Sequence, residues 1–173
     1  VLEEMRLLNY DKILVLPMFP QYASSSSGSA MQRALEVMSR WWVIPELEVV
    51  SQFYDEEFYV QTLVEQAQKH DLETFDHILM SYHGLPERHV DKVYDGKENL
   101  CKDHHCDTTL DTDNKYCYKA TSYETSRLIA ERMNLKDEDY TVCFQSRLAN
   151  KWLTPFSDDL IEACAKKGMK RLL

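Results

Sequence analysis

Hydrophobic and polar positions alternate along this chain in a way that predicts short strands separated by amphipathic helices. Apolar runs of strand length are found at 13–16, 47–53, 78–82 and 140–144. Between and after them, apolar residues recur at three- and four-residue spacing, which predicts helices at about 30–42, 60–67, 121–133 and 157–167. The final residues, 171–173, are expected to begin another strand.

This alternation indicates an α/β fold with a mainly parallel sheet flanked by helices. In such folds ligands bind beyond the carboxyl ends of the strands. Three marked loops, at 17–28, 83–86 and 145–155, each come directly after a predicted strand. We therefore expect them to lie at one edge and to form one site.

Local capping signals fix where the helices are expected to begin and end. Ser24–Ser29 supply N-cap candidates for the second element, and Thr121 with Glu124 resembles a capping box. Ser157 and the acids directly after it suit the start of the last helix, and Gly168 suits its end.

Composition narrows the classes of function. The net charge of −9 leaves no basic stripe to neutralise phosphates, which argues against a nucleic-acid partner. No apolar run approaches the roughly 20 residues that span a bilayer. The acidic opening Val1-Leu-Glu-Glu lacks the basic start of a signal peptide. A soluble, cytoplasmic protein is the expectation.

The five cysteines are an odd number, and disulfides are not expected in a cytoplasmic protein. Cys143 and Cys164 fall in apolar periodic segments, where they are expected as small core residues. Cys101, Cys106 and Cys117 lie instead in a polar stretch at about 90–119.

The first loop offers an anion site at the start of a helix, because free main-chain amides there attract carboxylates or phosphates. Its serines are equally consistent with capping alone. The nearby Trp41 and Trp42 suit either a lip beside a cleft or the core, and we favour the core.

In the second loop, His83 comes after a buried strand and precedes Gly84 and Pro86. A histidine held on such a turn can accept a proton near neutral pH or bind a metal, although it can also be purely structural. In the third loop, Arg147 could pair with a carboxylate and Trp152 offers a flat apolar wall. A surface arginine and a packing tryptophan are the alternatives.

Taken in order, the three loops resemble the ferrochelatase family. The matching segments are Leu16-Pro-Met-Phe-Pro-Gln-Tyr with its serines and Gly28, then Ser81-Tyr-His-Gly-Leu-Pro, then Phe144-Gln-Ser-Arg with Trp152-Leu-Thr-Pro155. Each motif is weak alone, whereas the ordered set is specific and covers essentially the whole chain.

The resemblance implies a chelatase-like fold of two similar lobes around a porphyrin cleft. Residues 1–52 would end the first lobe and residues 53–173 would begin the second, with a cysteine-containing insertion at about 90–119. The family's N-terminal strand and its C-terminal acidic segment have no counterpart here. We therefore expect an incomplete part of the enzyme that is inactive alone.

The activity implied is insertion of ferrous iron into protoporphyrin IX to form protohaem. His83 matches the family's catalytic histidine, either as iron ligand or as acceptor of pyrrole protons. The substrate-binding residues implied are Phe19, Tyr22, Ser25, Ser26, Gly28, Arg147 and Trp152. Phe19 departs from the tyrosine of many relatives and so lacks its hydroxyl.

Cys101, Cys106 and Cys117 resemble the ligands of a [2Fe–2S] cluster in some bacterial members of the family. Ser122 stands where a fourth cysteine is expected, and Ser24 where animal enzymes have one. His104, His105 or no residue would complete the set. A cluster, a zinc ion and no metal all stay open.

Two other functions remain as alternatives. One is a chelatase for another metal or tetrapyrrole, and the other is a non-catalytic metal- or iron–sulfur-binding module. The partners expected are porphyrin and ferrous iron, with peripheral membrane contact and oligomeric state left open.

Overall fold

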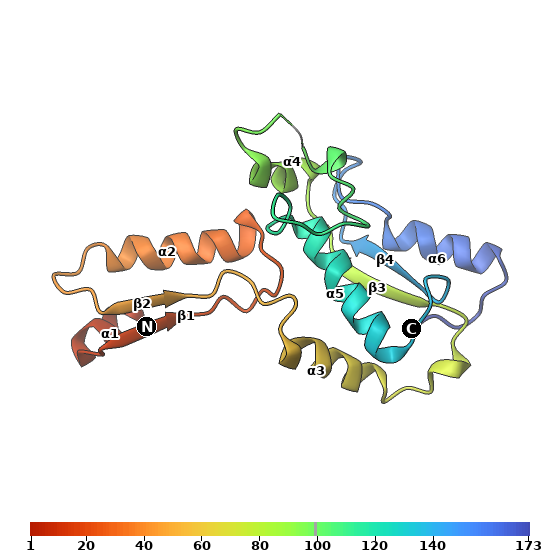
Figure 1. Ribbon diagram of the computed structural model, residues 1–173, viewed down its shortest axis with the longest axis horizontal. Helices are drawn as coiled ribbons and strands as arrows, with labels where there is room; N and C mark the ends of the chain where they lie inside the picture. The colour runs from red at the N-terminus through yellow and green to blue at the C-terminus, as the bar shows by residue number, and fades with distance from the viewer. Residues whose placement is uncertain (99) are drawn as a thin grey trace. The chain divides into compact units, whose positions relative to one another are not determined.

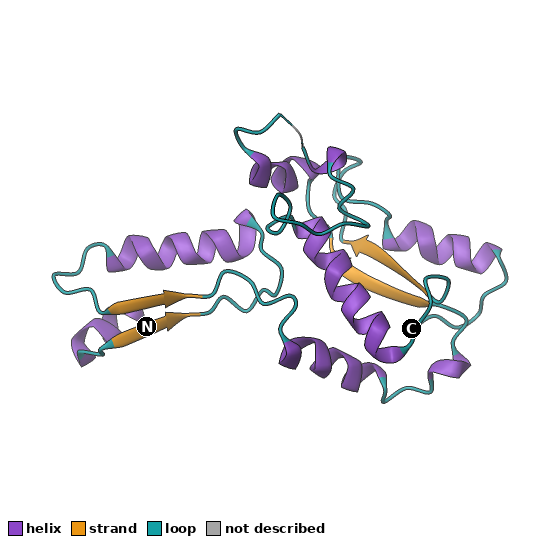
Figure 2. Cartoon of the chain, viewed as in Figure 1, coloured by secondary structure: helices purple, strands orange, loops and turns teal. Residues whose placement is uncertain are grey.

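The computed structural model describes residues 1–98 and 100–173 and divides the chain into two compact units, Val1–Phe53 and Tyr54–Leu173. Each unit contains a two-stranded parallel sheet flanked by helices (Figure 2). The predicted α/β class with parallel pairing is therefore confirmed. Of the insertion predicted at about 90–119, residue 99 lies outside the described residues.

The first unit packs helices on its short sheet, with Ile13 of one strand in register with Leu47 of the other. Ile13, Met38 and Trp41 are buried together and form its small core. Helix α2 lies along the sheet (Figure 1). The elements of this unit are α1 (Leu2–Met5), β1 (Lys12–Val15), α2 (Ser29–Met38) and β2 (Glu46–Val49).

The serine-rich loop does not cap helix α2 with its side chains, so this expectation is wrong. Ser24–Gly28 form a π-helical turn that runs directly into α2, with Gly28 at the N-cap. The Ser29 hydroxyl donates instead to the main-chain oxygens of Ser25 and Ser26, at 3.2 and 3.0 Å. Serine hydroxyls often bond backward to carbonyls in this way, and this competes with capping.

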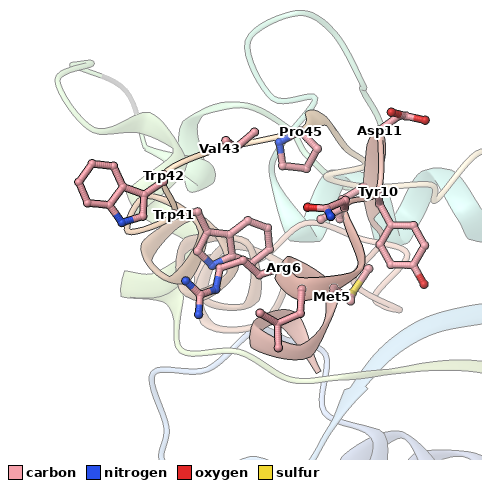
Figure 3. Close-up of a pocket in the computed structure, with 11 residues that line it drawn as sticks. Met5, Arg6, Tyr10, Asp11, Trp41, Trp42, Val43 and Pro45 are labelled. Carbon is pink, nitrogen blue, oxygen red and sulfur yellow. The ribbon is translucent and has the colours of Figure 1, made fainter.

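The two adjacent tryptophans of the first unit have different environments. Trp41 is 7% exposed and belongs to the core, as expected, whereas Trp42 is 98% exposed, so that a core position for it is wrong. Both tryptophans line a surface hollow of about 460 Å³ (Figure 3). Met5 and Tyr10 also line the hollow.

The second unit holds the longer strands, with Ile78 in register with Tyr140 and His83 with Gln145. Leu172 adds a parallel bridge to His77, as expected for a strand that begins there. Within the described residues no helix is both long and apolar enough to cross a membrane. The elements of this unit are α3 (Glu57–Ala67), β3 (Ile78–His83), α4 (Glu87–Val90), α5 (Tyr118–Met133), β4 (Tyr140–Gln145) and α6 (Ser157–Lys166).

Helices α5 and α6 cover opposite faces of the β3–β4 sheet. The Tyr82 hydroxyl lies 2.9 Å from that of Ser126 in α5, and the Ser81 hydroxyl lies 3.1 Å from that of Ser157 in α6. Neighbouring residues of a strand point to opposite faces, so these two contacts place the helices on either side. The sheet is thereby held in place on both faces.

Helix α5 begins earlier than the sequence suggests. Its N-cap is Cys117, and Thr121 lies within the helix, where its hydroxyl donates to the Cys117 carbonyl at 3.0 Å. Glu124 pairs with Arg127, so the predicted capping box is wrong. The end of α6 is as predicted, since Gly168 has a φ of +86° just after the last turn.

Candidate active site and cysteine centre

Two of the three marked loops come together at the carboxyl end of the β3–β4 sheet. Gly84 donates its main-chain N–H to the Gln145 oxygen at 2.8 Å, and Leu153 donates to Leu85 at 2.9 Å. Pro86 and Trp152 form an isolated bridge. The parallel pairing of the strands brings these segments together. The serine-rich loop belongs to the other unit.

His83 is the last residue of β3, and its side chain is exposed. Within the described part of the chain the imidazole has no hydrogen-bond or ion-pair partner, so both ring nitrogens are open to a ligand. Its main-chain oxygen, in contrast, accepts a 2.9 Å hydrogen bond from the Tyr118 hydroxyl. The backbone is therefore fixed while the ring is free.

Tyr118 was not singled out by the sequence pattern, because it is 35 positions from His83. The feature that could have drawn attention to it is a tyrosine directly after a cysteine in a polar stretch. Burial raises its pKa to about 12, so that the hydroxyl stays protonated and donates near neutral pH.

Gly84 is required by the close approach of two backbones. A Cβ at this position would stand 2.7 Å from the Gln145 main-chain oxygen and 3.4 Å from the Trp152 ring. Neither the β4 backbone nor the ring edge can withdraw easily, because both belong to the packed loop pair.

We therefore expect Gly84→Ala to destabilise the second unit by about 1–3 kcal/mol, the usual cost of overpacking. Denaturant unfolding of the variant measures this change. Gly28→Ala is a comparison, since its new Cβ would meet the Tyr22 hydroxyl at 2.9 Å, a side-chain atom rather than backbone. Equal stability of Gly84→Ala and the parent would contradict the predicted clash.

Arg147 lies beyond the end of β4, where its guanidinium is already engaged. It pairs with Asp158 at 2.8 Å and with Asp159 at 3.3 Å, and it stands over the Phe156 ring at 4.3 Å. These carboxylates belong to the first turn of α6. A substrate carboxylate would have to compete with both aspartates for this side chain.

Residues expected to contact substrate in the first unit differ in exposure. Phe19 is 47% exposed and Ser25 is exposed, whereas Tyr22, Ser26 and Gly28 are half-buried. Tyr22 packs against Gly28, since its hydroxyl lies 2.9 Å from the position that a Cβ would occupy there. Fully buried Ser27 carries a hydroxyl without a hydrogen-bond partner in the described structure.

The three cysteines of the polar stretch converge in the core of the second unit. All three Sγ atoms lie within 4.8 Å of one another, with 3.5 Å between Cys101 and Cys117. Cys106 and Cys117 are fully buried and Cys101 is 8% exposed. They pack with Val90, Tyr94 and Phe144, so the stretch that resembles a surface loop contributes to the core.

The surroundings of Cys106 favour its thiolate. Its sulfur accepts from the Tyr94 hydroxyl at 3.3 Å and from the Asn114 amide at 3.6 Å. Hydrogen bonds from Cys101 and Cys117 lower the pKa of Cys106 most, while hydrogen bonding within the trio and burial raise the pKa of Cys101. The directions of these shifts favour the thiolate form of Cys106 over that of Cys101.

This donor set fits a thiophilic metal. Three sulfurs of a tetrahedral site with bonds of about 2.3 Å lie about 3.8 Å apart, close to the spacing here. A [2Fe–2S] cluster has two ligands on each iron and needs a fourth donor. Cys101 also borders a surface hollow of about 180 Å³, whose lining includes Asp91, Lys102 and Lys119.

The candidates for a fourth ligand differ in availability. His104 stacks on Tyr94 at 4.5 Å, and its buried Nε2 has no hydrogen-bond partner among the described residues. His105 is exposed, and Ser122 donates its hydroxyl to the Tyr118 carbonyl at 2.8 Å. Among the described residues, the group of ligand atoms within 4.8 Å of one another contains the three sulfurs and neither histidine. His104 is the better candidate because burial leaves its ring nitrogen unsatisfied.

Two comparisons relate the chain to known proteins. A protein-family model for ferrochelatase matches residues 1–173. A curated ferrochelatase of Legionella pneumophila (strain Corby) is 35% identical over 162 residues, which cover 93% of this chain and 47% of that protein. The Coxiella burnetii (strain RSA 493 / Nine Mile phase I) ferrochelatase is 36% identical over 170 residues, covering 94% and 45%. The chain thus spans about half the length of these relatives and belongs to the ferrochelatase family.

Proposed function

We propose that this chain is the central part of an enzyme that inserts ferrous iron into protoporphyrin IX to form protohaem. The observation that carries the proposal is the free imidazole of His83 at the carboxyl end of β3, on a backbone held by Tyr118 and by the Gly84–Gln145 hydrogen bond. Such an edge is where α/β folds bind their ligands.

The proposed chemistry matches what this imidazole can do. Metal insertion removes two pyrrole N–H protons and replaces them with Fe²⁺. A neutral imidazole near the ring face can accept a proton from a pyrrole nitrogen, or it can bind the incoming iron. The fixed strand end orients the ring without occupying either nitrogen.

We assign the remaining substrate contacts as the sequence suggests. Trp152 beside Gly84 supplies a flat surface for the macrocycle. Arg147, oriented by Asp158 and Asp159, faces an acidic group of the porphyrin. From the first unit, Phe19, Tyr22, Ser25, Ser26 and Gly28 are proposed to contact the porphyrin. The exposure of Phe19 and Ser25 is compatible with this role.

We further propose that Cys101, Cys106 and Cys117 hold a metal centre, in the form of a [2Fe–2S] cluster with His104 as fourth ligand. The buried trio and the unsatisfied His104 nitrogen support a centre, and the resemblance to cluster-containing relatives supports its type. When bound, such a group cross-links the three thiolates within the core. The sulfur spacing is also compatible with zinc, which is the alternative tested below.

Absorption spectroscopy and metal analysis on anaerobically purified protein test the type of centre. Sulfide-to-iron charge-transfer bands with equal amounts of iron and acid-labile sulfide are the expected result. A colourless protein with one zinc per chain would replace the cluster by zinc. Protein without either metal that is as stable as a metal-loaded sample would contradict the centre itself.

Iron insertion is tested in a full-length enzyme that carries this segment and, in parallel, in the 173-residue chain. We expect the full-length enzyme to convert protoporphyrin and Fe²⁺ to protohaem, and the isolated chain to show no turnover. Cobalt insertion into another tetrapyrrole without iron insertion would favour the other chelatase. Tight metal binding without porphyrin binding would favour a non-catalytic module. Cytoplasmic location stays a prediction, and peripheral membrane contact stays open.

A further inference from the structure

Tyr118 connects two parts of the second unit that have been described separately. It is the first residue of α5 and comes directly after Cys117, the N-cap of that helix. Its hydroxyl reaches the main-chain oxygen of His83 at 2.9 Å. A single side chain therefore spans from a cysteine of the trio to the residue with the free imidazole.

At His83 this bond fixes the last peptide of the strand. The next peptide N–H, that of Gly84, donates to Gln145 at 2.8 Å, so the peptide between His83 and Gly84 is held through both its oxygen and its nitrogen. The plane of a peptide determines where the adjoining Cα–Cβ bond points. Loss of the tyrosine hydroxyl would release one of the two restraints on the direction of the imidazole.

At its other end, Tyr118 is held by the surroundings of the cysteines. The Cys117 N–H donates to the Asn114 oxygen at 2.7 Å, and the side chain of the same asparagine donates to the sulfur of Cys106. Thr121 and Ser122 bond back to the carbonyls of Cys117 and Tyr118, at 3.0 and 2.8 Å. The first turn of α5 therefore moves with Cys117.

We propose that Tyr118 is a positioning residue that couples metal occupancy of the cysteine centre to the orientation of His83. A metal that draws the three sulfurs together fixes Cys117, hence the first turn of α5, and hence the phenolic oxygen that holds the His83 carbonyl. The coupling rests on the proposed function in one respect only, which is that His83 accepts the pyrrole proton or binds the iron. The hydrogen-bond path itself is independent of the reaction.

The coupling is tested by NMR of the 173-residue protein labelled with ¹³C at main-chain carbonyls, with Zn²⁺ as the diamagnetic probe. One equivalent of Zn²⁺ is expected to shift the His83 carbonyl signal in the parent protein. In Tyr118→Phe the shift should fall at least threefold at unchanged zinc stoichiometry. Tyr123→Phe, which removes a hydroxyl from the same helix, should keep the parental shift. Cys106→Ala is the control for direct binding, because a His83 carbonyl shift that persists in this variant would come from zinc bound at His83 itself.

An equal zinc-induced shift in Tyr118→Phe and the parent would overturn the coupling. In the full-length enzyme, Tyr118→Phe is expected to lower kcat about tenfold with little change in KM for porphyrin, because the ring is retained and only orientation is lost. Unchanged kcat would also overturn the proposal. If His83→Ala kept full turnover while the NMR coupling persisted, the proposed function would fail and the path from Cys117 to His83 would stand.

Discussion

His83→Ala in a full-length enzyme carrying this segment should lower iron insertion by about 10²- to 10⁴-fold, the range typical of a lost acid–base group. The fold should persist, since the exposed imidazole makes no hydrogen bond or ion pair within the described residues, and Tyr118 and Gln145 hold only the backbone. Anaerobic assays of protohaem formation measure the rate, and denaturant unfolding measures stability.

A matched control is His89→Ala, which removes another histidine of the same unit, six positions along the chain in α4. It should leave the rate within about twofold of the parent, as expected for a substitution away from the reacting groups. Near-normal turnover by His83→Ala would remove this residue from the mechanism. A matching loss of stability in that variant would show a structural role in place of a chemical one.

Cys106→Ala should abolish stoichiometric metal binding and with it the stability that metal supplies. With free metal at a thousandfold excess over its dissociation constant, a ligand that binds only the folded state contributes about 4 kcal/mol. Elemental analysis gives the metal content. Unfolding with and without a chelator isolates the part of the free energy of unfolding that depends on metal.

Cys143→Ala is the control, because Cys143 is equally buried but lies outside the trio. Its removal should cost about 1 kcal/mol or a little more through lost packing and the lost contact with Ser157, as for other buried truncations. The metal-dependent part of its stability should equal that of the parent. If Cys106→Ala kept its metal and the metal-dependent part of its free energy of unfolding, other residues would form the centre.

The second unit could be predicted in outline from sequence because its signals are local. The apolar runs that end just before His83 and just before Gln145 specify buried strands, and their parallel pairing brings Gly84 and Trp152 together. The loop after each strand is therefore placed by topology alone. The meeting of the second and third motifs is the part of the site that sequence predicts well.

The burial of residues in the polar stretch at about 90–119 is harder to predict, for a physical reason. Its charged residues suggest a solvent-exposed loop, yet Cys106, Cys117, Tyr94 and Asn114 are fully buried. Asn114 is acceptable in the core because its amide is satisfied by Cys106 and by the Thr109 carbonyl. Such pairing depends on residues brought together by folding, and no hydrophobic period indicates it.

The start of helix α5 is another feature that depends on contacts made only on folding. Thr121 and Glu124 match a capping pattern, but the turn before Thr121 is helical as well, because Cys117 already provides the extended N-cap backbone. Local propensity cannot decide between two starts one turn apart when tertiary contacts favour the earlier one.

The three cysteines also bear on the order in which the second unit assembles. Cys101 and Cys117 are 16 positions apart, whereas the strand residues Ser81 and Cys143 that pair in the sheet are 62 positions apart by their numbers. Closing a short loop costs less chain entropy than closing a long one, and local contacts form sooner. A metal could therefore bind the nascent chain before β4 is synthesised, and the cross-linked loop would then offer a preformed surface for α5. For the metal centre proposed above, this spacing favours loading during synthesis over insertion into a finished core.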